Sequence, residues 1–258
     1  MTTERVRARV FGEVADEYDR IRPGYPAVLI DDVLSYARLG EVAALEVGAG
    51  TGKATLAFAA RGVGITAVEP DAAMAAVLAR RASGRSDVVV RVCGFEEYVP
   101  EQPFGLLFSA QAWHWTDPAV RWQRAAAALV PGGTLALFWN GDRPADPAVV
   151  AEIVAAHRKY APEIVPDTGP VDDAGLVTSW PYPELESSPQ FDDLSPRLYR
   201  SQRTLTASDY VAYLSTQSAY RMLDEAARTR LFETIVRRVG DCVTLDVQTV
   251  LYLARRTP

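Results

Sequence analysis

The sequence contains a short apolar run that ends directly in three closely spaced glycines. The run is AALEV at residues 43–47, and the glycines are Gly48, Gly50 and Gly52. Because a glycine has no Cβ, the backbone can turn sharply here and can come close to a ligand. The pattern predicts a buried strand, then a tight turn whose N–H groups can bind a ligand, then a helix over 51–60.

Four more short runs of apolar or β-branched residues follow, with helical patterns between them. They lie at residues 65–68, 87–92, 104–108 and 134–139, and further strands are expected over 197–205 and 243–253. Strands without polar alternation are typical of a parallel sheet that helices cover on both faces. We therefore expect an α/β fold with a doubly wound, seven-stranded, mostly parallel, Rossmann-like sheet and a helical cap or insertion.

Two aspartates predict where helices begin. Asp71 follows the second predicted strand, where its side chain can accept hydrogen bonds from the first free N–H groups of a helix. Asp117 is followed by Pro118, and proline is favoured in a first helical turn. Asp117 and Pro118 together predict a helix that runs to about Leu129.

The composition changes after Asn140. Prolines become frequent over 141–195, a segment that also carries Trp180, Tyr182 and Phe191. We expect three parts: residues 1–140 as an N-terminal cap segment and a cofactor-binding core, 141–195 as an inserted lid, and 196–258 as strands and helices that complete the core and the substrate pocket.

Charge and composition exclude several classes of protein. The net charge is -6, so the chain as a whole has no electrostatic reason to bind nucleic acid. There is no long apolar run for a membrane helix and no apolar signal segment at the N-terminus. We expect a cytoplasmic monomer or homodimer that binds a small molecule. The two cysteines and two histidines, Cys93, Cys242, His114 and His157, lack the spacing of metal ligands, so no metal is expected.

The spacing of the glycines distinguishes between nucleotide sites. It is GxGxG, whereas the dinucleotide fingerprint GxGxxG would require a glycine in place of Lys53. Glu69 ends the second predicted strand, where a carboxylate can accept hydrogen bonds from two ribose hydroxyls. A nicotinamide-dependent oxidoreductase and a cofactor-binding protein without transfer activity, such as a cyclase or a regulator, remain alternatives.

The ordered segments LEVGAGTGK, VEPDAAM, CGFEEY, FSAQAWHW and LVPGGTLALFW resemble class I S-adenosylmethionine-dependent methyltransferases, in particular their type 11 small-molecule branch. AQAWHWTDP and FGEVADEYDRIRPGYP are similar to a subgroup that includes trans-aconitate methyltransferases. The resemblance implies transfer of a methyl group from S-adenosylmethionine (SAM), with S-adenosylhomocysteine (SAH) as product. The acceptor is expected to be a small organic molecule methylated on oxygen, with carbon or nitrogen as alternatives.

The resemblance also implies which residues bind the cofactor. Glu46 and the glycines would hold the methionine and ribose portion, Glu69 the ribose, and Met74 the adenine. Phe95 and Glu96 would flank the adenine, although Cys-Gly-Phe replaces the Gly-Asp-Ala common in the family at this point. The full expected set is Glu46, Gly48, Ala49, Gly50, Gly52, Glu69, Pro70, Met74, Phe95, Glu96, Ser109 and Gln111.

His114 is the candidate general base, because it lies just beyond the fourth predicted strand, at the ligand-binding edge of such a sheet. A structural role for His114 is the alternative, and His157 is expected to be solvent-exposed. The residues expected at the substrate and its lid are Tyr18, Arg22, Tyr25, Trp113 and Trp115. Phe11, Tyr18 and Tyr25 could close over the cofactor or anchor the N-terminal segment to the core.

Overall fold

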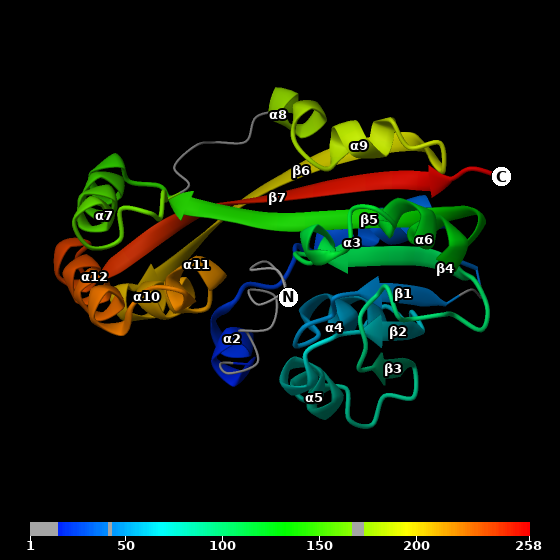
Figure 1. Cartoon of the computed structure of the whole chain (residues 1–258), viewed down its shortest axis with the longest axis horizontal. Coiled ribbons are helices and arrows are strands. Elements are labelled where there is room, and N and C mark those ends of the chain that lie inside the picture. Colours follow the sequence, from blue (N-terminus) through cyan, green and yellow to red (C-terminus); the bar gives the residue numbers. More distant parts are fainter. Residues whose placement is uncertain (1–14, 41–42, 167–172) are drawn as a thin grey trace. The chain divides into compact units, whose positions relative to one another are not determined.

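The computed structural model describes residues 15–40, 43–166 and 173–258. The helices and strands, labelled as in Figure 1, are α2 Ala15–Ile21, α3 Ala27–Ala37, β1 Ala44–Val47, α4 Lys53–Ala59, β2 Ile65–Val68, α5 Ala72–Arg81, β3 Val88–Arg91, β4 Phe104–Ala110, η2 Trp113–Trp115, α6 Arg121–Ala128, β5 Leu129–Pro144, α7 Pro147–Tyr160, α8 Asp173–Thr178, α9 Tyr182–Glu186, β6 Phe191–Thr206, α10 Ala207–Ser215, α11 Ser218–Arg221, α12 Glu225–Arg238 and β7 Cys242–Arg256.

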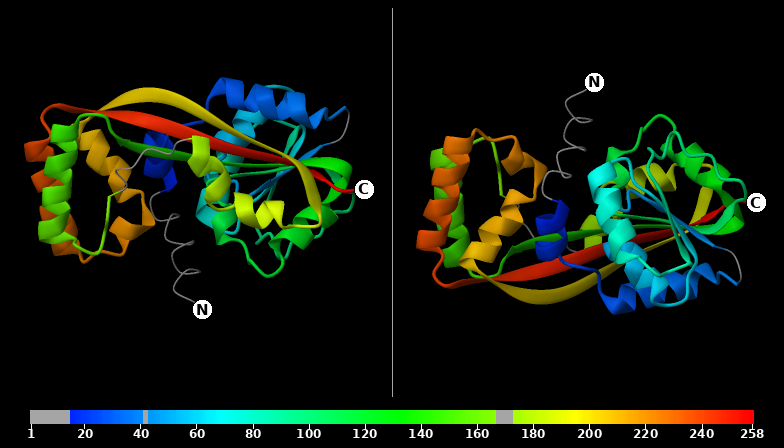
Figure 2. Two further views of the ribbon diagram at one scale, coloured as in Figure 1. Left: turned by 90° about the horizontal axis from the view of Figure 1, so that it is seen from above. Right: turned by 90° about the horizontal axis from the view of Figure 1, so that it is seen from below.

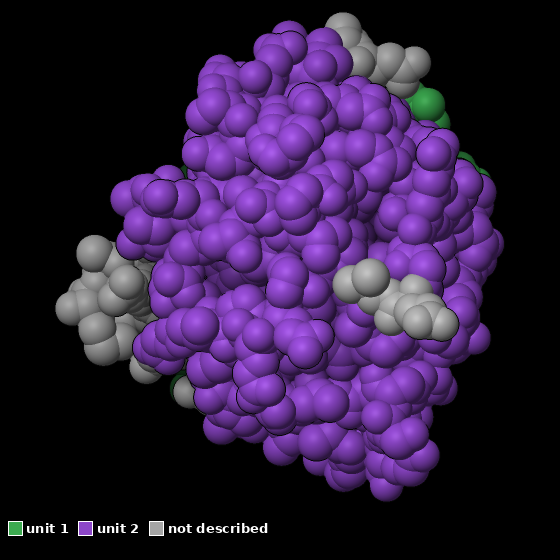
Figure 3. Space-filling model, turned by 90° about the vertical axis from the view of Figure 1, so that its right-hand side faces the viewer, with its two compact units in different colours: residues 1–23, 141–170, 200–248 green, residues 24–140, 171–199, 249–258 purple. Residues whose placement is uncertain are grey.

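The chain divides into two compact units, which Figure 3 shows in different colours. Unit 1 comprises residues 1–23, 141–170 and 200–248, and unit 2 comprises 24–140, 171–199 and 249–258. The boundaries at 140, 199 and 248 fall inside β5, β6 and β7, so these strands contribute residues to both units. The three-part division expected from composition stays a prediction. None of the helices in the described ranges is long and apolar enough to cross a membrane.

The strands form one seven-stranded sheet in the order β3-β2-β1-β4-β5-β7-β6. The first five pair in parallel, with Val47 of β1 opposite Val68 of β2 and Glu46 opposite Phe108 of β4. The arrows of β5 and β7 in Figure 1 point in opposite directions, so the sheet is mixed. The expected α/β fold with a doubly wound, mostly parallel sheet is confirmed.

Helices cover both faces of the sheet in unit 2 (Figure 2). On one face α3, α4 and α5 pack around Phe58, Phe108 and Phe138, and the rings of Phe58 and Phe108 lie 4.3 Å apart. On the other face α6 and α9 pack around Trp113 and Leu137. Each fully buried side chain of this size contributes roughly 1.5–3 kcal/mol of hydrophobic stabilisation, so this packing fixes the strand ends that carry the expected site.

Unit 1 has a core of its own, formed by α7, α10, α12 and part of β7. His157 on α7 lies in this core and is only 2% exposed, so the expectation that it is solvent-exposed is wrong. The carbonyl of Ile153 can only accept, so Nδ1 of His157 donates to it over 2.7 Å. Nε2 then accepts from the Tyr220 hydroxyl at 2.9 Å, which leaves both ring nitrogens satisfied.

The two predicted helix starts differ in outcome. Asp71 is confirmed as an N-cap, because its Oδ1 accepts from the N–H groups of Ala73 and Met74 at 2.9 and 3.1 Å. The helix expected after Asp117 begins later, at Arg121. Asp117 instead forms a turn, in which its carboxylate accepts from Ala119 at 2.9 Å and its carbonyl from the Arg121 N–H at 2.9 Å.

Candidate active site

The glycine turn lies at the carboxyl end of β1 and leads into α4. Gly48, Gly50 and Gly52 have φ values of +71°, +56° and +87°. Residues other than glycine rarely adopt this backbone conformation. A Cβ on Gly48 would lie 2.3 Å from Cβ of Ala112, and one on Gly52 would lie 2.2 Å from Cδ1 of Leu78. Packing therefore requires glycine at these two positions.

Gly50 differs from the other two glycines of the turn. A Cβ added to Gly50 would meet only Cε of Met74, at an ordinary contact distance of 3.6 Å. Among the described residues, no other atom outside the turn lies within 4 Å of that added Cβ. Backbone that bends here with one uncovered glycine fits the close approach of a cofactor.

Glu69 immediately follows β2 and holds the turn from the neighbouring strand. Its Oε2 accepts from the Gly50 N–H at 2.7 Å and its Oε1 from the Asp71 N–H at 2.9 Å. Burial of this carboxyl group raises its pKa to about 7, against the lowering effect of the two N–H donors. Each carboxylate oxygen can accept a further hydrogen bond, so two vicinal hydroxyls could bind here.

Glu46 is a second buried acid, on β1 just before the turn. It is 1% exposed, and its Oε2 accepts a hydrogen bond from the hydroxyl of Thr55 on α4. Burial, together with the nearby charge of Glu69, raises the pKa of Glu46 to about 8. Within the described chain neither acid forms an ion pair with Lys or Arg, and two buried acids of this kind favour a cationic ligand.

Several expected adenine contacts lie near the ends of β2 and β3. Met74 on α5 is buried, with its methyl group toward Gly50, whereas Pro70 is exposed. Phe95 is also buried, and Glu96 accepts a hydrogen bond from the Asp117 N–H at 2.7 Å. Glu96 thereby connects the loop after β3 to the loop after β4.

Ser109 and Gln111, at the end of β4, make bonds within the protein. The buried Ser109 hydroxyl donates to the carbonyl of Val47 at 2.8 Å, which joins β4 to the end of β1. Gln111 has a left-handed φ of +61°, and its Nε2 donates to the carbonyl of Asn140 at 2.9 Å. Ala49, the remaining expected residue of the turn, is buried.

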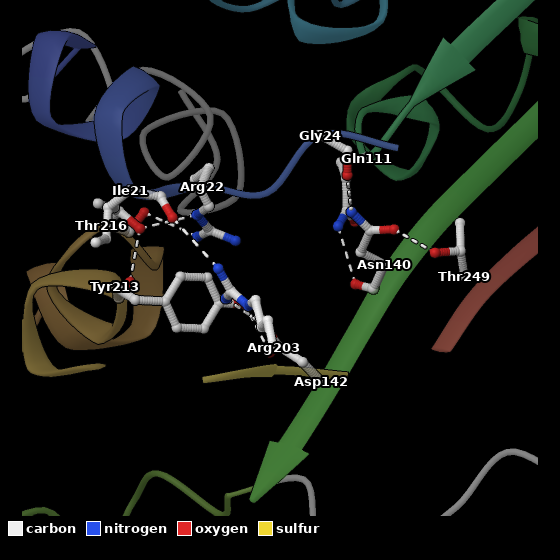
Figure 4. Close-up of polar contacts among 10 residues, drawn as sticks. All are labelled: Ile21, Arg22, Gly24, Gln111, Asn140, Asp142, Arg203, Tyr213, Thr216 and Thr249. Atoms are coloured by element: carbon white, nitrogen blue, oxygen red, sulfur yellow. Dashed lines mark hydrogen bonds and ion pairs between the residues drawn. The ribbon is translucent and has the colours of Figure 1, made fainter. Parts of the chain in front are cut away.

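Asn140, which the sequence did not single out, connects three segments of unit 2, as Figure 4 shows. Its Nδ2 donates to the carbonyl of Gly24 at 3.0 Å, and its Oδ1 accepts from the Thr249 hydroxyl at 2.6 Å. Together with the bond from Gln111, these contacts fix the backbone at the end of β4. The sequence signal that could have identified Asn140 is its position as a polar residue directly after the apolar run 134–139.

The three residues of η2 have different environments. Trp113 is completely buried, with its ring 5.6 Å from that of Phe95 and 5.4 Å from that of Trp122. The structure thus places Trp113 in the core and not on a surface that a substrate could touch. His114 is exposed, and its ring lies 4.6 Å from that of the half-buried Trp115.

His114 has a defined hydrogen bond. Its Nδ1 accepts from Nε1 of Trp139 over 3.3 Å, so a neutral ring carries its proton on Nε2. Although part of His114 is open to solvent, the surrounding aromatic side chains desolvate its ring, and this, with the nearby charge of Arg121, lowers the pKa of His114 to about 4. In this arrangement Nε2 can donate a hydrogen bond to a ligand, whereas the lone pair that a general base needs is already engaged.

The remaining expected lid residues fall in different units. Tyr25, in unit 2, lies edge-on to Phe138, with 4.8 Å between the ring centroids. Arg22, in unit 1, lies over the ring of Tyr18 at 5.1 Å, and its Nε donates to the Thr216 hydroxyl at 2.8 Å (Figure 4). Phe11 lies outside the described residues.

The described part of the chain contains no cluster of side chains suited to bind a metal ion. No group of three or more His, Cys, Asp or Glu side chains within the described ranges is arranged to hold an ion.

Comparison with known proteins identifies the segment that contains this site. Residues 45–137 match the methyltransferase domain of the type 11 family. An uncharacterised methyltransferase of Mycobacterium tuberculosis is 39% identical over 132 residues, which are 50% of this chain and 51% of that protein. The chain thus matches about half the length of these curated relatives. A Dictyostelium discoideum protein named as a methyltransferase is 22% identical over 94% of this chain and 92% of its own length.

A solved structure supports the fold over nearly the whole chain. The structure of an Anaeromyxobacter dehalogenans protein named as a type II methyltransferase has a TM-score of 0.63 and 22% identity, and the match covers 92% of this chain and 99% of that one. At this identity the likeness concerns the fold alone.

Proposed function

We propose that the protein transfers a methyl group from SAM to a small organic acceptor, because residues 45–137 match the type 11 methyltransferase domain and the fold is similar to that of a methyltransferase structure. The contact between the Gly50 N–H and Glu69 carries this proposal, because it joins the glycine turn to an acid on the adjacent strand. SAM carries its methyl group on a positively charged sulfur. When the methyl group is transferred, the rest of the molecule leaves as a neutral thioether.

The residues present fit such a cofactor. Glu69 would accept the two ribose hydroxyls, and the uncovered backbone at Gly50 would lie against the nucleoside. The buried Glu46 would favour the positive charge of the methionine portion. The buried Met74 and Phe95 would supply apolar surface for the adenine, and Glu96 would lie beside it. These groups would orient the donor and exclude water, which are the main requirements for an in-line displacement.

The acceptor is the less constrained partner. We propose methylation on oxygen, with carbon or nitrogen as alternatives, because the resemblance of AQAWHWTDP and of the N-terminal segment is to small-molecule enzymes, including the trans-aconitate subgroup. His114 would contribute a hydrogen bond from Nε2 to the acceptor, since its Nδ1 already accepts from Trp139. Monomer and homodimer remain equally open.

Two measurements test this function. Native mass spectrometry of the purified protein should show a retained nucleoside with the mass of SAM or SAH. Incubation with methyl-tritiated SAM and a fractionated small-molecule extract should transfer the label to at least one organic product. If SAH binds but no fraction acquires label, the protein is a cofactor-binding protein without transfer. If NAD raises the melting temperature and SAM does not, the protein is an oxidoreductase.

A further inference from the structure

A cluster of aromatic rings lies beside the proposed donor site, entirely within unit 2. Trp139, at the end of the apolar part of β5, lies 5.4 Å from Trp180, and the two rings cross at 68°. His114 lies 6.5 Å from Trp180, at an interplanar angle of 88°, and accepts the Trp139 N–H. The buried Tyr252 supports Trp139 from β7 at 6.2 Å. Three rings thus stand approximately edge to face, an arrangement that presents both ring faces and polar edges.

Hydrogen bonds and a neutralised charge hold the cluster in place. Nε1 of Trp180 donates to Oε1 of Glu184 at 3.1 Å, and Glu184 also pairs with Arg121 at 2.5 Å. The Arg121 guanidinium lies over the Trp180 ring at 5.0 Å and is only 5% exposed. The cation is thus paired with a carboxylate next to the rings, and burial keeps the Arg121 side chain from direct contact with a ligand in solution.

Part of the cluster is accessible. Trp180 is 37% exposed, His114 is exposed and Trp139 is half-buried. The accessible ring surface of these residues can therefore contact a ligand.

The cluster adjoins the glycine turn through the chain itself. Ala112, two residues before His114, packs so closely on Gly48 that a Cβ there would lie 2.3 Å from its methyl group. The carbonyl of Phe138, the residue before Trp139, accepts from the Gln111 N–H at 2.9 Å. His114 and Trp139 thus follow residues that are held where β4 ends, at the edge of the sheet that carries the turn.

From this geometry we propose that Trp139, Trp180 and His114 bind the methyl acceptor, and that the acceptor is a planar, uncharged aromatic molecule bearing a hydroxyl group. The inference rests on the proposed methyltransferase function and specifies its substrate class. The ring faces of the two tryptophans would stack on the acceptor, and the Nε2–H of His114 would donate to its oxygen. For a polycarboxylate, as the trans-aconitate resemblance would suggest, the one described cation in contact with Trp180, Arg121, is buried and paired with Glu184.

The corresponding reaction balances without a further reactant. The hydroxyl oxygen forms a bond to the methyl carbon, the carbon–sulfur bond breaks and its electron pair stays on sulfur. The hydroxyl proton leaves to water, because Nδ1 of His114 is occupied by Trp139. The products are the methyl ether, SAH and a proton.

The test uses the full chain saturated with SAH, with 2-naphthol as the planar, uncharged probe and citrate as the polycarboxylate. Binding is measured by ligand-observed NMR and by quenching of tryptophan fluorescence. We expect 2-naphthol to bind and citrate not to bind. Trp180→Ala should weaken 2-naphthol about tenfold, and Trp180→Phe by less than about threefold, because phenylalanine keeps a stacking face.

A matched control separates binding from packing. Nε1 of Trp122 donates to the same carboxylate of Glu184, at 3.2 Å, but its ring packs on buried Trp113 and Phe191. Trp122→Phe should leave 2-naphthol affinity unchanged, and SAH affinity should be equal in all variants. The inference is overturned if 2-naphthol does not bind, if Trp180→Ala binds it as well as wild type, or if citrate binds more tightly. Loss of SAH binding in the wild-type protein would instead refute the proposed function.

Discussion

The backbone N–H of Gly50 donates a 2.7 Å hydrogen bond to Oε2 of Glu69. The two residues are 19 positions apart and meet because β1 and β2 are parallel neighbours, with Val47 opposite Val68. Parallel strands bring their carboxyl ends to the same edge of a sheet, so a turn after one strand lies next to an acid after the other. The proposed cofactor site is this pair of strand ends.

Replacing Gly50 by Leu should abolish SAH binding while the protein remains folded. The new side chain would start where only the Met74 methyl group is near, at 3.6 Å, and would fill the space assigned to the nucleoside. Calorimetry measures the affinity, and thermal unfolding measures the cost of the left-handed backbone, roughly 1–2 kcal/mol.

Gly62→Leu is the matched control for that variant. Gly62 has a φ of +81° and nothing within 4 Å of an added Cβ. Leucine at this position should therefore cause the same backbone strain as at Gly50, but away from the proposed cofactor site. Both variants should lose similar stability, and only Gly50→Leu should lose SAH. Wild-type affinity in Gly50→Leu would contradict the assigned site.

Binding of SAM should release protons near neutral pH. The pKa values of Glu46 and Glu69 are raised from 4.5 to about 8 and about 7, so the free protein holds protons that the unfolded chain has lost. This contribution to stability is present below pH 4.5 and is lost as the pH rises through 7 and 8. A bound cation lowers both pKa values, so SAM affinity should increase from pH 6 to pH 8.

Calorimetry in two buffers of different ionisation enthalpy measures the protons released. Glu46→Gln should release fewer protons than wild type at pH 7, and its SAM affinity should vary less with pH. Binding enthalpies that are identical in phosphate and Tris would exclude this coupling.

His114 should be a neutral imidazole with its proton on Nε2 at pH 7. Its pKa is lowered from 6.5 to about 4, first by burial and then by the charge of Arg121. Long-range ¹⁵N–¹H NMR distinguishes the tautomers, and the chain has only two histidines, so His157→Gln assigns the signals. A titration midpoint near 6.5 for His114 would show that its ring is solvated and not held by Trp139.

His157 should make unit 1 less stable in mild acid. Burial lowers its pKa below 6.5, so the unfolded chain takes up the proton first, and stability falls as the pH drops below 6.5. Urea unfolding at pH 7.5 and pH 5 measures the effect. His157→Gln should be about 1 kcal/mol less stable at pH 7.5, from the weakened bond to Tyr220, but should lose less on acidification. Equal pH dependence in the two proteins would rule out this role.

The central sheet could be predicted because its signals are local. The apolar runs before Gly48 and Glu69 predict β1 and β2. Because the two strands pair in parallel, their carboxyl ends lie together. The helix N-cap at Asp71 could also be predicted, because it depends only on two N–H groups close by in the sequence. Asp117 carries the same local signal, yet its side chain closes a turn while Glu96, from another loop, binds its backbone N–H.

Burial within the site could not be predicted. The segment Trp113–Trp115 has no periodicity that separates a core residue from an exposed one, yet Trp113 is buried and His114 exposed. His157 follows two alanines in a helix with charged residues after it, and only the tertiary partner Tyr220 makes its burial possible. The cluster of Trp139 and Trp180 likewise joins residues 41 positions apart, which no local pattern connects.

Titration of SAH and its 2′,3′-dideoxyribose analogue into wild type and Glu69→Gln tests most directly whether Glu69 and the turn hold the nucleoside. Hydrogen bonds to a charged group contribute roughly 1.5–3 kcal/mol, so wild type should prefer SAH over the analogue by at least about tenfold. Glutamine keeps an oxygen for the Gly50 N–H but lacks the charge, so the preference should fall to a few-fold in the variant. The same preference in both proteins would contradict the account, because the ribose would then bind elsewhere.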